Sequence, residues 1–491
     1  MSSAAIILTG VGIYLVIMLF IGVYASRRVG SSSTEFMVAG RNMPLMLCSV
    51  TIVATWFGGG SMMGGGGASY QGGLLAVVAD PFGAALCLLL VGFFFVRIFR
   101  RLRLLTVIDF FESRYGKTAA TIAAIGSISS NIGWTGGLLV AFGVIFQTLT
   151  NIPLETGILG GAVVVFLYTS IGGMWAVAMT DFVQMIVIVL GLLVLLVVVL
   201  VDVGGWSSVT AQLPEGTFRL LPEEADAPQW LNYFRAWVIF GLADVSAQTL
   251  MQRAASARNE QVAQNSFYIA GIAHLIIGLI PVVLGIIASV TMVGLVSPET
   301  IIPELALTHL HPIAIAIFVG ALLAAIMSSA DSALLAAATV FSVNVLPLFR
   351  RGITDKQRLF ATRLAIPVLG CISIYVALRV QLIYDLILDA NSVILVCVTV
   401  PFIAGLWWKK ANRSAALASM ASGFLLWLIA TIYMPGFPGD LMGLIAGLVA
   451  FIVVALFTQH LDPPRPLLDG EGEEIKLENR LGVLPLFRAA K

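Results

Sequence analysis

Four carboxylates interrupt long apolar stretches of the sequence: Asp80, Asp181, Asp244 and Asp331. An ionisable side chain in such a stretch is costly and usually serves a function. Lys and Arg are found only near the predicted ends of these stretches. Buried acids without basic neighbours favour a cationic partner, which can be a metal ion, a proton or an organic cation.

Asp331 belongs to a segment rich in small hydroxyl side chains, Ala-Ile-Met-Ser-Ser-Ala-Asp-Ser at 325–332. Asp331 flanks one helical face, on which four residues share the spacing i, i+3, i+4, i+7: Ala325, Ser328, Ser329 and Ser332. Hydroxyl, carbonyl and carboxylate oxygens suit a hard cation. The alternative is that the hydroxyls bond to their own helix. The carboxylate in the same turn favours the cation.

The other three acids have a structural interpretation beside the functional one. Asp181 stands at the predicted start of an apolar stretch, where Asp often caps a helix. Asp80 precedes Pro81 and can mark a polar kink, and Asp244 can bond to the backbone of a broken helix. Beside a helix break, either acid could instead attract a cationic group. His274 is isolated and is expected to be a satisfied core histidine.

Membrane-spanning helices must position these residues, because the composition excludes a soluble domain. Of 491 residues, 59% are hydrophobic and 11% charged, and the mean hydropathy is +1.00. A soluble domain cannot hide that much apolar surface, and the stretches are too long for strands of a membrane barrel. With 27 basic and 26 acidic residues, no nucleic-acid partner is expected. The four histidines are scattered, which disfavours a membrane-embedded enzyme.

Thirteen stretches are long enough to cross a lipid bilayer, at about 20 residues per span. Lys and Arg concentrate in cytoplasmic loops, and placing the N-terminus outside puts 24 of the 27 on the inside. We therefore expect a multi-pass cell-membrane protein with one transmembrane domain over 1–458 and a short cytoplasmic tail over 459–491. The spans are 5–25, 44–70, 74–99, 118–149, 155–174, 179–201, 230–252, 265–295, 312–346, 359–379, 382–408, 413–432 and 439–458.

Ten of these spans fit an inverted repeat of five plus five helices. We expect the first repeat over 44–201 and the second over 230–408, with one extra helix before them and two after. The first span of each repeat contains break signals, which are seven glycines within 58–67 and the polar residues around Asp244. Close helix packing is the alternative use of the glycines. Paired broken helices are typical of secondary transporters, whose binding sites lie at the breaks.

Two motifs resemble the sodium:solute symporter family: Gly-Gly-x-x-Ala-Val-x-x-Thr-Asp-x-x-Gln at 172–184 and Met-Ser-Ser-Ala-Asp-Ser at 327–332. The resemblance covers about 5–460. It implies an all-α LeuT-type inverted-repeat fold and sodium-coupled import of a small organic solute, with no enzymatic activity and no obligate protein partner. The segments 54–60 and 80–83 are most similar to the high-affinity choline transporter branch.

The resemblance also implies where the ions bind. A sodium site shared by the family would lie between the first helix break and the span 312–346. Its ligands here would be Ala54, Phe57, Ala325, Ser328 and Ser329, the first two through backbone carbonyls. A second sodium site, found in some members, would use Asp181, Asp331 and Ser332 together with Ser328.

The predicted solute site lies beside the same break. Two aromatic positions of the choline branch are kept, Trp56 and Trp134, whose rings can attract an ammonium group. We expect the solute to be an organic cation or a zwitterion. Proton coupling through the buried acids, and a carboxylate or another solute, remain alternatives. The predicted solute-binding residues are Trp56, Gly59, Ser61, Asp80, Trp134 and Asp244.

Overall fold

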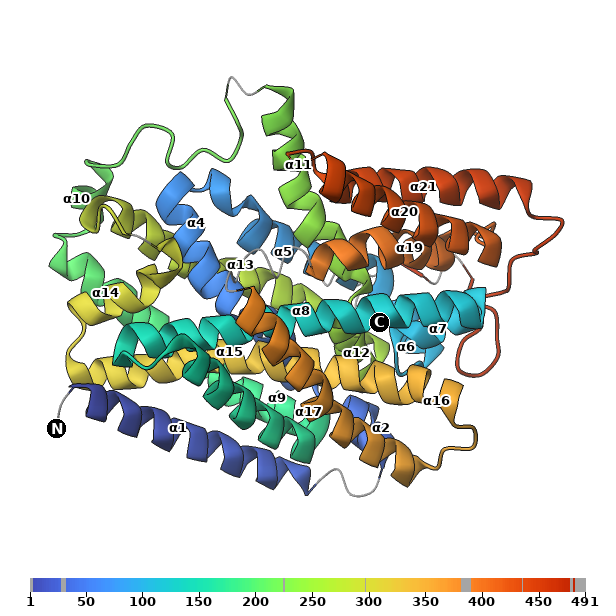
Figure 1. Ribbon diagram of the computed structural model, residues 1–491, viewed down its shortest axis with the longest axis horizontal. Helices are drawn as coiled ribbons and strands as arrows, with labels where there is room; N and C mark the ends of the chain where they lie inside the picture. The colour runs from blue at the N-terminus through green and yellow to red at the C-terminus, as the bar shows by residue number, and fades with distance from the viewer. Residues whose placement is uncertain are drawn as a thin grey trace, which may run out of the picture.

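The computed structural model describes residues 3–27, 32–223, 226–295, 297–380, 390–434, 436–476 and 480–481. Within these residues the regular structure is helical, apart from two isolated β-bridges. Most of the long helices run along the long axis of the molecule (Figure 1). They are α1 (Ser3–Ser26), α8 (Lys117–Thr150), α9 (Leu154–Asp202), α13 (Glu260–Thr291), α15 (Pro312–Val340), α17 (Asp355–Arg379), α20 (Arg413–Tyr433) and α21 (Gly439–Phe457).

Shorter helices complete the fold, and several of them are pieces of one broken span. The span 75–102 is divided by π-helical turns. Its pieces include η4 (Val78–Gly83), α5 (Ala84–Leu90) and α6 (Val96–Leu102). Other short helices are α2 (Ser33–Val38), α7 (Val107–Tyr115), α10 (Trp206–Thr210), α14 (Ile301–His309), α16 (Leu346–Phe349) and α19 (Val400–Trp407).

Ten helices of the described residues are long and apolar enough to cross a membrane, or eleven if one bent pair counts as a span. The predicted total of thirteen therefore stays a prediction. Two predicted spans, 155–174 and 179–201, fall within the single helix α9, which has 49 residues. A straight helix of that many residues would be about 73 Å long at 1.5 Å per residue, more than twice the ~30 Å of the hydrocarbon core, so a break between the two spans is expected.

Gly173 divides α9 into two segments. Its φ of +55° and ψ of −148° are non-helical, and a left-handed φ favours glycine. A Cβ atom at this position would lie 2.4 Å from the carbonyl oxygen of Phe36 on α2. The second glycine of the 172–184 motif is therefore required both by its backbone conformation and by the close approach of α2.

Both predicted helix breaks are present. The first separates α3 (Leu45–Trp56) from η2 (Gly60–Gly64) and α4 (Gly65–Gly72), and the helix axis bends by 57° at this break. The second separates α11 (Ala227–Leu242) from α12 (Gln248–Ser256) by the 3-10 turn η6 (Ala243–Ser246). Apolar spans interrupted at corresponding places are what the inverted-repeat prediction requires.

The first break lies against α15, which forms the centre of the molecule. Every residue of α15 from 318 to 340 is buried, and α1, α8 and α9 all pack on this helix. Glycines at the break permit the contact. A Cβ atom at Gly58 would lie 2.4 Å from Ser329 Oγ, and one at Gly59 would lie 3.0 Å from Ala141 Cβ on α8.

Charged side chains gather at one end of the helix bundle. In Figure 1, α1 begins at the end of the molecule that carries α10 and α14, whereas α6, α7 and α16 lie at the opposite end. The arginines of α6, Arg97, Arg100 and Arg101, lie at this second end. The described part of the tail also lies here and is folded against the bundle, because Leu467 and Ile475 are each only 5% exposed.

Candidate functional site

Four oxygen atoms meet where the end of α3 contacts α15. The hydroxyl of Ser328 lies 2.9 Å from the carbonyl oxygen of Ala54 and 3.1 Å from that of Ala325. The hydroxyl of Ser329 lies 3.3 Å from each of the same two carbonyl oxygens. All four residues are fully buried. The predicted ligands of the shared sodium site are therefore neighbours, although Ala54 and Ser328 are 274 positions apart in the sequence.

Phe57, the fifth predicted ligand, ends α3. Its backbone leaves the helical conformation, with φ −77° and ψ 75°, and the next residue, Gly58, packs against Ser329. Two carbonyls and two hydroxyls, with a further backbone carbonyl at the helix end, form a donor set made of oxygen atoms alone. Such a set fits a hard alkali cation.

A second group of polar residues lies near the same face of α15. Asp331 accepts a hydrogen bond of 2.7 Å from the hydroxyl of Tyr168 and one of 3.1 Å from Ser332. Asp181 accepts a hydrogen bond from the hydroxyl of Thr51. Its other carboxylate oxygen, Oδ1, is buried and has no hydrogen-bond partner among the described residues. A buried carboxylate oxygen without a donor is a position where a cation can bind.

Two sequence-based interpretations of this group need correction. Asp181 is not a helix cap, because the break in α9 is at Gly173 and Asp181 lies well inside the following helical segment. The buried acids also have a basic neighbour. Arg253, which directly follows the predicted span 230–252, is fully buried at the end of α12.

Arg253 reaches into the group around α15. It donates hydrogen bonds to Ser332 Oγ and to the carbonyl oxygens of Thr51 and Thr249. The burial of Arg253 could not be predicted from the sequence, because α12 is short and amphipathic and directly follows an apolar run. Among the described residues the guanidinium forms no ion pair with Asp181 or Asp331, but it lies near both. One positive charge beside two carboxylates leaves a single net negative charge, which is enough for one monovalent cation.

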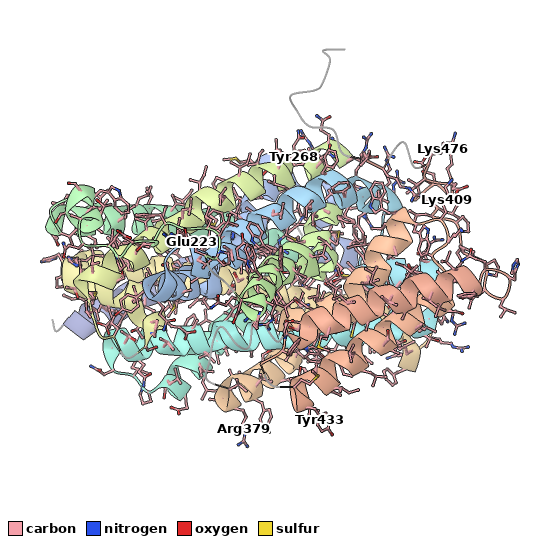
Figure 2. All side chains as sticks on the ribbon, turned by 90° about the horizontal axis from the view of Figure 1, so that it is seen from above. Glu223, Tyr268, Arg379, Lys409, Tyr433 and Lys476 are labelled. Carbon is pink, nitrogen blue, oxygen red and sulfur yellow. The ribbon has the colours of Figure 1, made fainter. Side chains whose placement is uncertain are left out.

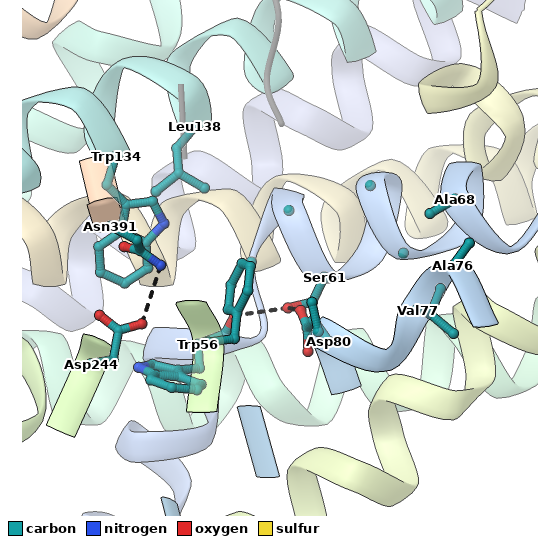
Figure 3. A pocket seen from close by; sticks show the side chains of 16 residues that line it. Trp56, Ser61, Ala68, Ala76, Val77, Asp80, Trp134, Leu138, Asp244 and Asn391 are labelled. Carbon is teal, nitrogen blue, oxygen red and sulfur yellow. Dashed lines mark hydrogen bonds between the residues drawn. The ribbon is translucent and has the colours of Figure 1, made fainter. Parts of the chain in front are cut away.

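A narrow cavity lies on the other side of the α3 break. Its volume is about 50 Å³, room for a few waters, so an organic solute needs the walls to move apart. Five predicted solute-site residues line it: Trp56, Ser61, Asp80, Trp134 and Asp244 (Figure 3). Gly59 does not, because it faces α8, but its neighbours Gly58 and Gly60 do. Phe240 and Asn391 also line the cavity and were not predicted.

Asp80 is held from two sides. One carboxylate oxygen accepts a hydrogen bond from Ser61 (Figure 3), and the other lies 2.8 Å from Nε2 of His274 on α13. The imidazole also packs edge-on against the rings of Trp56 and Phe57, with centroids 6.0 and 6.2 Å apart. His274 was expected to be only a core residue. It is fully buried, as expected, but it also contacts two candidate solute-binding residues, the carboxylate of Asp80 and the ring of Trp56.

Asp244 approaches the cavity from the second break. Its carboxylate accepts a hydrogen bond of 3.3 Å from the amide of Asn391 (Figure 3). Trp134 on α8 lies near this pair in the same wall. Each acid of the cavity thus lies near a tryptophan, and the described lining contains no Lys or Arg.

Comparisons with known proteins agree with this architecture. The model of the sodium:solute symporter family matches residues 36–423. The human "High affinity choline transporter 1" is 27% identical over 91% of this chain and 82% of its own length. The sodium/pantothenate symporter of Escherichia coli (strain K12) is 29% identical over 90% of this chain and 94% of its own.

A solved structure extends the comparison to the fold. An outward-open Na⁺-coupled sialic acid symporter superposes with a TM-score of 0.80 at 18% identity, covering 92% of this chain and 98% of the other. This likeness confirms the predicted all-α, LeuT-type fold. The family match spans most of the chain and contains both broken helices and α15. It identifies sodium as the coupling ion and excludes an enzyme. The chain belongs to the sodium:solute symporter family of membrane-embedded secondary transporters.

Proposed function

We propose that this symporter imports a small organic solute carrying a positive charge, either a cation or a zwitterion, together with sodium. The observation that carries the proposal is the wall of the cavity at the helix breaks. It contains two carboxylates and two indole rings, and among its described residues no basic side chain. An ammonium group would meet a carboxylate and an aromatic face at either side of this cavity.

A zwitterion finds a second kind of partner in the same cavity. The helical arm after the first break begins at Gly60, which lines the cavity. The start of a helix offers free backbone N–H groups and the positive end of the helix dipole, which bind a carboxylate without a basic side chain. This feature also supports the alternative of a pure carboxylate, and the matched relatives include one named for pantothenate.

Sodium and solute would share the α3 break. Ala54, on the α15 side, contributes the carbonyl that contacts Ser328. Two residues later, Trp56 lines the cavity, and its carbonyl accepts a 3.0 Å hydrogen bond from Ser61. A cation that fixes the end of α3 would therefore also fix Trp56 and Ser61. Sodium binding would in this way organise the solute site before alternating access exposes both to the cytoplasm.

The orientation belongs to the same proposal. The arginine-rich end of the bundle would face the cytoplasm, which places the start of α1 outside and the tail inside (Figure 1). Inward-directed sodium would then also gain about 2.3 kcal/mol per charge for each 100 mV of membrane potential.

Uptake into proteoliposomes tests the proposal directly. We expect an inward sodium gradient to drive uptake of an amine, betaine or amino acid, and an equal potassium gradient to fail. A panel of labelled solutes that includes acetate and pyruvate tests the charge preference. Uptake driven equally by a proton gradient without sodium would favour the proton-coupled alternative. Best transport of a pure anion would contradict the cationic or zwitterionic solute.

A further inference from the structure

A basic hollow lies far from the solute cavity, at the arginine-rich end of the molecule. Its volume is about 620 Å³, which is within the usual range for a small-ligand pocket. Three segments distant in the sequence form it: the end of α6, the start of α13 and the tail around Gly470. In Figure 2, Tyr268 of α13 and Lys476 of the tail lie along the same edge of the molecule. Five arginines and three carboxylates line the hollow: Arg97, Arg100, Arg101, Arg103, Arg258, Glu260, Asp469 and Glu471.

The carboxylates do not neutralise this hollow. Glu260 pairs with the Nε atoms of Arg97 and Arg101, at 3.1 and 2.8 Å. In the ion pair between Arg103 and Glu471 both side chains are exposed, at 57% and 70%. Such surface pairs contribute little to stability. Two net positive charges remain when the lining charges are counted.

Two of the arginines contact no carboxylate in the described part of the chain. Among the described residues, Arg100 donates only to the carbonyl oxygens of Ala257 and Arg258, at 2.8 and 3.3 Å. Arg258 is exposed. Guanidinium groups of this kind can offer paired N–H donors to a phosphate.

The surroundings of the hollow are positive as well. Nearby Arg41 donates hydrogen bonds to the carbonyl oxygens of Arg103 and Leu104. The pKa of its guanidinium is lowered to about 10, first by burial and then by repulsion from Arg100 and Arg103. Helix α13 also begins at the hollow, with Asn259 as its N-cap, so the positive end of a long helix dipole faces it.

The hollow lies where two candidate membrane spans end, which is where lipid headgroups are expected. The span 75–102 ends at its edge, and the span 260–291 begins there. A basic pocket between the ends of transmembrane helices is suited to the phosphate of an anionic lipid. We propose that this hollow binds a phosphate-bearing anion, with Arg100 and Arg258 as its principal ligands. The phosphate could belong to an anionic lipid headgroup or to a free phosphate ester, and the two sources can be separated by experiment.

The test measures the apparent melting temperature of the purified full-length protein in detergent. Dioctanoyl phosphatidylglycerol is titrated against dioctanoyl phosphatidylcholine, whose ammonium group would face the arginines, and against glycerol 3-phosphate. We expect phosphatidylglycerol to raise the melting temperature by about 3 °C or more at saturation and phosphatidylcholine to do so much less. A full shift with glycerol 3-phosphate would identify a free phosphate ester as the ligand, and a shift with phosphatidylglycerol alone would identify a lipid.

Variants locate the site. Arg258→Glu reverses an exposed charge that has no described carboxylate partner, so it should fold normally and raise the half-saturating ligand concentration by about tenfold or more. Arg100→Gln together with Arg258→Gln should weaken binding further. The matched control is Arg350→Gln with Arg351→Gln, which removes two exposed charges elsewhere at the same end. A wild-type response in Arg258→Glu and in the Arg100/Arg258 variant, or an equal loss in the control, would overturn the proposal. Neither result depends on which solute is transported.

Discussion

The two sides of the α3 break hold negative charge in different ways. Near α15, Asp181 and Asp331 are completely buried, and a buried guanidinium, that of Arg253, lies close by. In the cavity, Asp80 and Asp244 are held by a histidine, a serine and an asparagine. The first region, which we call the ion region, contains a cationic side chain of the protein itself. The second region, the cavity, has none among its described lining residues. The ion region is therefore preorganised, and the cavity keeps its charge available for a solute.

The strongest test of this difference is to remove the hydroxyls of Ser328 and Ser329 from the ion region. In a Ser328→Ala, Ser329→Ala double variant, sodium would lose two oxygen contacts. At about 1.5–3 kcal/mol for each polar contact with a charge, we expect the half-saturating sodium concentration to rise by about a hundredfold or more. Sodium titrations of uptake and of melting temperature measure the change. Ser419→Ala, which removes another buried hydroxyl on α20, is the control. Unchanged sodium affinity in the double variant would disprove the site.

Removing the cationic side chain should damage the ion region next most. Arg253→Gln leaves two buried carboxylates without their balancing charge, which should lower the free energy of unfolding by roughly 3 kcal/mol. Adding Asp181→Asn to this variant removes one of the two charges and should restore much of the loss. Denaturation of the purified protein provides the measurement. If the second substitution restores nothing, Arg253 does not act through charge balance.

The cavity can be tested through its aromatic wall. A desolvated contact between an ammonium group and an indole contributes about 2 kcal/mol, so Trp56→Ala should weaken binding of a cationic solute roughly thirty-fold. Trp206→Ala, an exposed tryptophan on α10, is the control. Competition assays with choline, betaine, acetate and pyruvate distinguish the outcomes. An anion that competes best, with its affinity intact in Trp56→Ala, would refute the cationic group.

The smallest expected effect concerns the residue behind the cavity. His274→Phe keeps a ring against Trp56 but removes the hydrogen bond to Asp80, which should weaken binding of a cationic solute by about tenfold. His274→Gln can still donate to the carboxylate and should recover part of that loss. Sodium affinity should change little in either variant. If both variants lose the same affinity, the hydrogen bond has no role of its own.

The sequence was sufficient to predict the helical fold, the two breaks and the grouping of the serines with Asp331. Those features follow from hydrophobic length, glycine placement and helical spacing, which are local properties. Five of the six predicted solute-site residues line one cavity, and three of these five, Trp56, Ser61 and Asp244, lie in the two spans whose breaks were predicted. Gly59 does not line this cavity and lies against α8; the sequence pattern of a helix break does not indicate which way each of its residues points.

The partners of the acids could not be predicted. Asp80 meets His274 across 194 positions of sequence, and Arg253 reaches Ser332 across 79. Such pairs depend on how helices cross and not on any local pattern.

The backbone carbonyls of the candidate sodium site affect which substitutions the chain can accept during evolution. A substitution at Ala54 or Ala325 alters a side chain but leaves the carbonyl oxygen that contacts Ser328 and Ser329. The cavity instead presents side chains such as Asp80 and Trp134, each of which a single codon change can replace. We therefore expect descendants of one ancestral chain to acquire new cargo step by step while the carbonyl ligands of sodium are inherited unchanged.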